Sequence, residues 1–181
     1  MRSVRIKPAL SLLALLLAGG SPCLAQQETG PAAHNAVFFE LLGNGGVYSF
    51  NYERMLTESL GLRVGVAAWN SPILWDGGGR PDRYATVPVT LSYLLGRGER
   101  KLELGGGVTF GQGTLDRSSD QRRDFSFRSV TAIVGYRSQP KGRGYLFRVG
   151  ATPFYSFDDG EEAYPDPGLT FSAGVSFGYR L

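Results

Sequence analysis

The sequence predicts an all-β protein: an eight-stranded antiparallel up-and-down transmembrane β-barrel preceded by a cleavable signal peptide. Three observations support this fold class. The last segment, residues 169–181, alternates apolar and polar residues without a break, which is the period of a β-strand. The first 25 residues have the organisation of a secretory leader. Between these ends, segments of alternating character are joined by connections that are short and long in turn.

The leader has a basic start, an apolar run over residues 9–18 and small residues before a cleavage site that we place ahead of Gln26. Its apolar run is far shorter than the roughly 20 residues that a spanning helix needs. Pro22, directly before Cys23, disfavours a lipoprotein cysteine. We therefore expect a signal peptide over 1–25, a flexible amino-terminal lead over 26–35 and a barrel domain over 36–181.

Removal of the leader changes the charge of the chain. The sequence has 19 Lys and Arg against 16 Asp and Glu, and the leader holds three basic and no acidic residues, so 19 − 3 leaves 16 against 16. A nucleic-acid partner is not expected, because no basic excess remains. The single cysteine leaves with the leader, which excludes disulfides and cysteine-ligated metals from the mature chain. We expect no cofactor and no metal.

Four strands are expected in the first half of the barrel. Asn44-Gly45 lies between the first two, and both residues are expected to take positive φ in a tight hairpin turn. Pro88 lies inside the fourth strand and predicts a bulge or kink, because proline removes a ladder donor. The four strands are expected over residues 36–42, 47–55, 60–69 and 83–95.

The second half predicts four more strands, over residues 101–110, 125–137, 145–155 and 169–181. Short turns are expected at 57–59, 96–100 and 138–144, and long loops at 70–82, 111–124 and 157–168. The first hairpin, at 43–46, departs from this alternation by being short on the side of the long loops. An even strand number with short turns at one end and longer loops at the other is typical of bacterial outer-membrane barrels.

The composition of the two strand faces predicts which face is outside. A soluble barrel turns its large apolar row inward and covers its surface with charge. Here the polar row is mostly Gly, Ser and Thr, which suits the narrow lumen of a small barrel. Charges on that row must pair with one another, because an unpaired buried charge is costly. We expect a lumen network formed by Glu40, Glu53, Arg63, Glu103, Arg148 and Arg180, and interfacial girdles that include Tyr52, Tyr93, Tyr136, Tyr155 and Tyr179.

The closing strand carries Phe177, Tyr179 and Leu181 on its apolar row and resembles the carboxy-terminal assembly signal of outer-membrane barrels, which usually end in an aromatic residue. The predicted mature chain as a whole resembles the small eight-stranded class similar to the transmembrane domain of outer-membrane protein A. The resemblance implies outer-membrane lipids and lipopolysaccharide as surroundings, and barrel-assembly machinery and periplasmic chaperones as partners during biogenesis. Because the chain ends at Leu181, we expect no periplasmic peptidoglycan-binding domain.

The leading functional hypothesis is a non-enzymatic outer-membrane protein with a plugged lumen and a structural or surface-interaction role through its external loops. Possible contacts with divalent cations or lipopolysaccharide phosphates come from two loops, and the residues are Arg117, Arg122, Arg123, Asp158, Asp159, Glu161 and Glu162. Alternatives are a narrow pore for small solutes and a soluble periplasmic lipocalin-like barrel that binds a ligand inside. A lipid hydrolase is disfavoured, because the only histidine, His34, precedes the first strand and no catalytic set is expected.

Overall fold

The computed structural model describes residues 34–70, 83–116, 122–157 and 168–181, of which 70, 115, 116, 122 and 123 are described by their backbone alone. The expected signal peptide and most of the expected lead lie outside these residues. No helix in the described part of the chain is long and apolar enough to cross a membrane.

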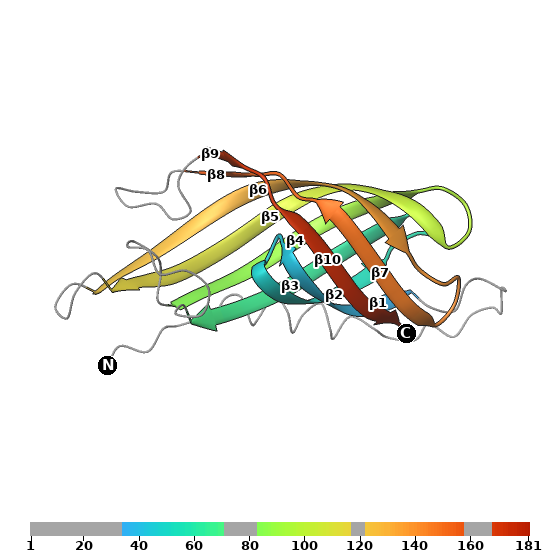
Figure 1. Cartoon of the computed structure of the whole chain (residues 1–181), viewed down its shortest axis with the longest axis horizontal. Coiled ribbons are helices and arrows are strands. Elements are labelled where there is room, and N and C mark those ends of the chain that lie inside the picture. The colour runs from blue at the N-terminus through green and yellow to red at the C-terminus, as the bar shows by residue number, and fades with distance from the viewer. Residues whose placement is uncertain (1–33, 71–82, 117–121, 158–167) are drawn as a thin grey trace. The chain divides into compact units, whose positions relative to one another are not determined.

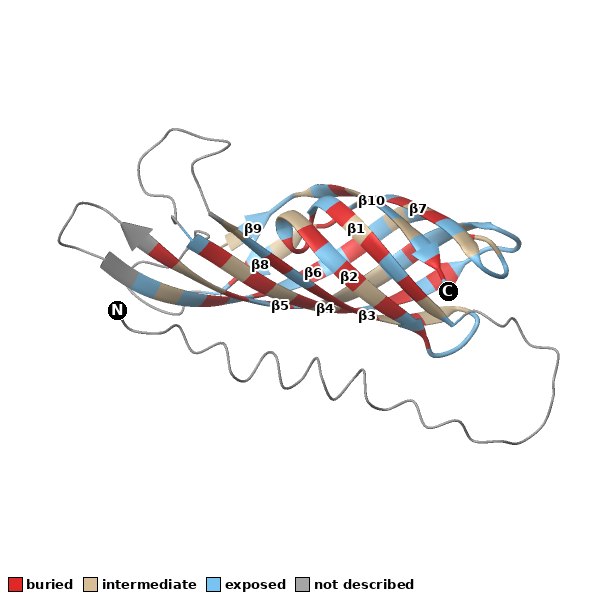
Figure 2. Ribbon diagram, turned by 90° about the horizontal axis from the view of Figure 1, so that it is seen from below, coloured by how far each residue is buried: buried red, intermediate tan, exposed pale blue. Residues whose placement is uncertain are grey.

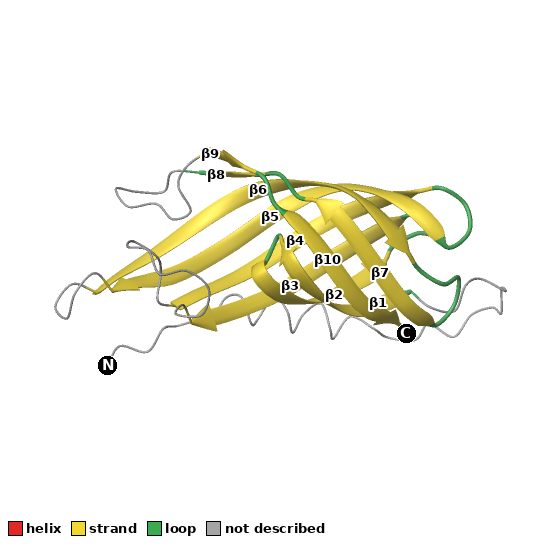
Figure 3. Cartoon of the chain, viewed as in Figure 1, coloured by secondary structure: helices red, strands yellow, loops and turns green. Residues whose placement is uncertain are grey.

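The described residues form ten β-strands and the turns that join them (Figures 1 and 3). Each expected strand is present. The strand expected over 145–155 is divided into β7 and β8, and the strand expected over 169–181 into β9 and β10. The strands are β1 (Asn35–Gly43), β2 (Gly46–Met55), β3 (Leu60–Asn70), β4 (Arg83–Leu95), β5 (Arg100–Asp116), β6 (Arg122–Ser138), β7 (Gly144–Ala151), β8 (Phe154–Ser156), β9 (Gly168–Thr170) and β10 (Ala173–Arg180).

Eight of these strands close into a ring in the order β5-β4-β3-β2-β1-β10-β7-β6, and β6 pairs back to β5. All pairings are antiparallel. The strand β8 continues β7 without a change of register. Val134 of β6 faces Ala151 of β7, and three residues away Thr131 of β6 faces Phe154 of β8. The strands β9 and β10 are related in the same way. The predicted eight-stranded barrel is therefore confirmed.

The interruption between β7 and β8 occurs where Pro153 has no N–H to give to the ladder. The Pro153 carbonyl still accepts a hydrogen bond from the Ala132 amide at 2.9 Å, and the Thr152 amide donates to the Ser172 carbonyl at 2.7 Å. The closing strand predicted without a break over 169–181 is wrong in one respect. It is interrupted at 171–172, between β9 and β10 and opposite Pro153. The alternation of faces continues across the break.

Exposed and buried residues alternate along the strands (Figure 2). On β6, Val130, Val134 and Tyr136 are exposed, whereas Thr131 and Ile133 are buried. The same division holds for β4 and β10, where the large apolar residues at odd positions face outward. The lumen is therefore lined mainly by polar and small residues, as the composition of the two rows predicts.

The expected long loop over 111–124 is wrong. β5 runs to Asp116 and β6 begins at Arg122, and the two strands pair along their whole length to Asp116 opposite Arg122. The polar composition that indicated a loop belongs to a strand pair whose outer face becomes polar near its end. Arg122 and Arg123 accordingly lie in β6, opposite Asp116 and Leu115.

Of the bulge or kink expected at Pro88, the bulge is wrong and the kink stays a prediction. β3 and β4 keep one register on both sides of it, from Val64 opposite Val89 to Ala67 opposite Thr86, and lose only the two pairs in between. Pro88 is fully buried in the lumen. Gly65 makes room for it, since a Cβ at Gly65 would lie 2.9 Å from the Pro88 ring. The missing donor is thus accommodated by a local loss of pairing rather than by an inserted residue.

Candidate functional site

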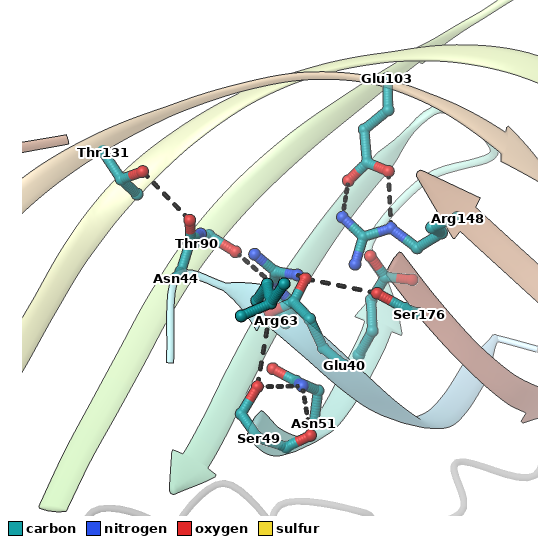
Figure 4. A network of polar contacts seen from close by, with 12 residues as sticks. Glu40, Asn44, Ser49, Asn51, Arg63, Thr90, Glu103, Thr131, Arg148 and Ser176 are labelled. Carbon is teal, nitrogen blue, oxygen red and sulfur yellow. Dashed lines mark hydrogen bonds and ion pairs between the residues drawn. The ribbon is translucent and has the colours of Figure 1, made fainter. Parts of the chain in front are cut away.

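Among the described residues, three ion pairs join strands across the interior of the barrel. Arg148 of β7 donates to Glu103 of β5 through two hydrogen bonds, Nε to Oε2 at 2.7 Å and Nη2 to Oε1 at 2.5 Å (Figure 4). Arg63 of β3 donates from Nη1 to Glu40 Oε1 of β1 at 3.1 Å. All four side chains are buried. Charged hydrogen bonds of this bidentate form are strong and hold both partners in one geometry.

The third pair joins Glu53 of β2 to Arg137 of β6, again in a bidentate arrangement, with Nη1 to Oε1 at 2.8 Å. Arg137 is absent from the predicted network. Its signal was the alternation of β6 itself, because Arg137 has the same parity as Thr131 and Ile133, which face the lumen. With this residue, three carboxylates face three guanidinium groups inside the barrel.

Arg63 and Glu40 are held by further polar contacts. Arg63 Nε donates to Thr90 Oγ1 at 2.8 Å, and the hydroxyls of Ser176 and Ser49 donate to the two oxygens of Glu40 at 3.3 and 3.4 Å (Figure 4). The guanidinium carbons of Arg63 and Arg148 lie 5.8 and 5.0 Å from the ring centre of Phe38, which is buried in the lumen. This ring gives two like charges a shared aromatic face.

Arg180, the sixth member of the expected network, lies near the end of the barrel that carries the short turns. Its Nη1 donates to the Pro140 carbonyl in the turn between β6 and β7 at 2.8 Å. Its side chain is buried and belongs to the rim rather than to the central pairs.

The turn between β1 and β2 is folded into the lumen. Asn44 and Gly45 are buried, and three threonine hydroxyls on three other strands donate to them. Thr86 of β4 donates to the Gly45 carbonyl at 2.8 Å, Thr131 of β6 to Asn44 Oδ1 at 3.1 Å, and Thr109 of β5 to the Asn44 carbonyl at 3.4 Å. The turn therefore occupies the lumen above the ion pairs.

Positive φ occurs beside this turn and not in it. Leu42 has φ 52° and Gly46 has φ 99°, whereas neither Asn44 nor Gly45 has positive φ. The expected turn geometry is wrong, because the polar contacts of the tip with β4, β5 and β6 bend the hairpin inward at its two flanking residues. Gly46 is required there for a second reason, since a side chain would overlap the Trp69 ring.

Several buried polar atoms of the lumen have no hydrogen-bond partner among the described residues. They include one guanidinium nitrogen of each arginine in the three ion pairs, the Asn44 amide nitrogen and the Ser92 hydroxyl. Buried groups of this kind are ordinarily satisfied by ordered water. The interior thus has the chemistry of a hydrated space.

The remaining predicted site residues lie elsewhere. Arg117, Asp158, Asp159, Glu161 and Glu162 lie outside the described residues. Phe177, Tyr179 and Leu181 are exposed on the outer wall. His34 is exposed, and its carbonyl accepts a hydrogen bond from the Met55 amide at 2.7 Å. No group of three or more His, Cys, Asp or Glu that could hold a metal ion occurs within the described ranges.

Comparison with known proteins adds evidence for the fold. No family model and no curated protein matches the sequence. Among solved structures, the chain is similar to the crystal structure of the N-terminal β-barrel domain of Pseudomonas aeruginosa OprF, with a TM-score of 0.59. The identity is 12%, and the match covers 81% of this chain and 95% of that chain. The chain therefore has the fold of an eight-stranded outer-membrane β-barrel.

Proposed function

We propose that this chain is an integral protein of the bacterial outer membrane, that it is exported by its signal peptide, and that it acts without catalysis. One observation carries the proposal: large apolar side chains are exposed around the ring while ion pairs are buried inside it. Phe50 is 61% exposed on β2, Val134 51% on β6 and Phe177 57% on β10. Such a surface is incompatible with water and suited to lipid. It also disfavours the soluble lipocalin-like alternative, which requires the opposite orientation.

The lumen, on this proposal, is plugged. The ion pairs fill it at one level and the β1–β2 turn fills it at another. The role of the protein is then structural or lies in surface interactions through its external loops. Contacts of Arg117, Arg122, Arg123, Asp158, Asp159, Glu161 and Glu162 with lipopolysaccharide phosphates or cations belong to this proposal, as does recognition of Phe177, Tyr179 and Leu181 by the assembly machinery.

The proposal is tested by comparing boiled and unboiled protein from the membrane fraction in SDS electrophoresis. A closed barrel that resists detergent is expected to migrate faster before boiling than after it. Recovery in the soluble periplasmic fraction, with no such difference in mobility, would show that the apolar wall does not face lipid.

A narrow pore is the second candidate function. The unpartnered buried polar atoms favour it, because water that satisfies them would form part of a path through the lumen. Single-channel recording in planar bilayers separates the two candidates. The plugged barrel predicts long closed periods at every voltage, and a pore predicts steady conductance of the unmodified protein.

A further inference from the structure

Along the two longest strands, β5 and β6, the apolar and the polar face exchange sides. On their outer face, Val108 pairs with Val130, and Phe110 follows; all three are exposed. Beyond Phe110 the outer residues are Gln112 opposite Ser126, then Thr114 opposite Asp124, whose side chains form a hydrogen bond of 2.9 Å. Ser126 and Asp124 are exposed, Gln112 is half-buried and Thr114 is buried. The outer face therefore changes from apolar to polar, and this part of β5 and β6 has a surface suited to water.

The inner face changes in the opposite direction at the same level. Below, it carries Thr109, Ser129 and Thr131; above, it carries Phe127 and Phe125. The facing residues on β5 are Gly111 and Gly113, where any side chain would overlap these rings. We name as the inner aromatic cluster the four rings on this face, which are Trp69, Tyr84, Phe125 and Phe127.

The inner aromatic cluster is continuous from strand to strand. The ring centres of Trp69 and Tyr84 lie 4.4 Å apart, those of Tyr84 and Phe127 5.4 Å, and those of Phe125 and Phe127 6.5 Å. Tyr84 and Phe127 are buried, whereas Trp69 and Phe125 are half-buried and keep part of their ring surface accessible. This apolar face lies beyond the β1–β2 turn, above the polar lumen.

One side of this region has no wall of paired strands in the described part of the chain. β2 pairs with β3 only as far as Phe50 opposite Val66, so Ala67 to Asn70 pair with β4 alone. β3 to β6 extend beyond the β1–β2 hairpin (Figure 1). The β1–β2 hairpin ends before β3 to β6 do, because its polar turn is folded into the lumen. Its rim is apolar, since Leu41 is exposed and Leu42 is 57% exposed.

Ring contacts lead across this rim from the outer wall to the inner aromatic cluster. Phe50 lies 5.1 Å from Phe39, Phe39 lies 6.0 Å from Tyr48, and Tyr48 lies 6.1 Å from Trp69. Phe50 is on the outward face that we assign to lipid, and Trp69 belongs to the inner aromatic cluster. A chain of ring contacts therefore links the proposed lipid interface to the inner aromatic cluster.

We propose that the inner aromatic cluster binds an acyl chain of a lipid from the surrounding bilayer, which enters sideways over Leu41 and Leu42. The inference rests on the proposed membrane location. The acyl chain would exchange one apolar environment for another and would cover ring surface that water otherwise contacts.

Tryptophan fluorescence in vesicles of phosphatidylcholine with brominated acyl chains tests this proposal, because bromine quenches tryptophan on contact. Trp69→Phe and Trp75→Phe together remove both native tryptophans. Single reporters are then placed by Phe125→Trp in the cluster, Val130→Trp on the outer wall and Phe38→Trp in the lumen. The first two are expected to lose about half or more of their emission, since a chain in van der Waals contact lies within about 4.5 Å. The Phe38→Trp reporter is expected to keep its emission.

The three reporters separate failure of this inference from failure of the proposed function. Quenching of Val130→Trp without quenching of Phe125→Trp would leave a membrane barrel whose cluster takes no acyl chain. Quenching of Phe38→Trp as well would show that lipid enters the lumen generally, which also overturns the inference. No quenching of Val130→Trp would contradict the membrane location. Native Trp69 in a Trp75→Phe background gives the same readout if Phe125→Trp does not fold.

Discussion

The buried ion pairs decide the energetics of the barrel at the scale of single residues. Removal of two charges from water costs several kcal/mol per ion. The Glu53–Arg137 and Glu103–Arg148 pairs compensate through bidentate geometry, and the Glu40–Arg63 pair through one charged hydrogen bond. Glu53 and Arg137 meet from strands on either side of the lumen, and both are almost fully buried. Each partner is stable in its position only while the other is present.

Arg137→Ala is therefore expected to destabilise the folded barrel by about 3–5 kcal/mol, because it leaves the Glu53 carboxylate buried without its partner. Urea unfolding of the protein in lipid vesicles measures the difference. Arg143→Ala removes an exposed arginine from the neighbouring turn and is expected to change stability by less than about 0.5 kcal/mol. Equal stability of the two variants would mean that the central pairs contribute nothing.

At the scale of elements, the β1–β2 hairpin has a tip that points into the lumen. Its tip bends inward because Asn44 and Gly45 find donors on β4, β5 and β6, and the flanking Leu42 and Gly46 supply the unusual backbone angles. The cost of positive φ at Leu42 is of the order of 1–3 kcal/mol and must be offset by these contacts. The hairpin thereby acts both as wall and as plug.

The double variant Thr86→Val and Thr131→Val removes two hydroxyls that hold the turn while keeping the volume of the side chains similar. We expect a loss of about 1 kcal/mol for each hydrogen bond and longer conducting periods in planar bilayers, because the turn is held less firmly. Thr170→Val, at an exposed position of β9, is the matched control. Unchanged closed periods in the double variant would show that the turn does not close the lumen.

At the scale of the whole barrel, the outer surface divides into a part suited to lipid and a part suited to water. The division is clearest on β5, where Val108 and Phe110 precede Gln112 on the same face. Strands of this length exceed the roughly 9–11 residues that cross a bilayer. The excess residues form the region where apolar side chains turn inward.

Arginine substitution on the outer face of β5 tests this division. Val108→Arg is expected to destabilise the barrel in lipid by about 2–4 kcal/mol if Val108 lies near the bilayer midplane, because lipid solvates the charge poorly. Gln112→Arg is expected to change stability by about 0.5 kcal/mol or less, as on an ordinary wet surface. Unfolding in vesicles measures both, and an equal effect would place the two positions at the same depth.

The expectations that held were those that depend on local pattern. Period-two alternation assigns each residue to a face without knowledge of its neighbours, so Glu40, Glu103 and Arg148 were predicted in the lumen and Phe177 on the wall. The same rule applied to the end of β6 would have included Arg137. The loop expected over 111–124 was wrong because polar composition indicates a loop and an outward strand face equally well.

The sequence alone determined the strand number, the orientation of the faces and the kinds of residue in the lumen, because these follow from period and composition along the chain. The tertiary structure decided which carboxylate meets which guanidinium, since the three pairs join residues 23, 45 and 84 positions apart. It also decided that the β1–β2 turn bends inward and that the apolar and polar faces of β5 and β6 exchange sides. These features depend on contacts across the closed ring, and closure brings together residues that no local pattern relates.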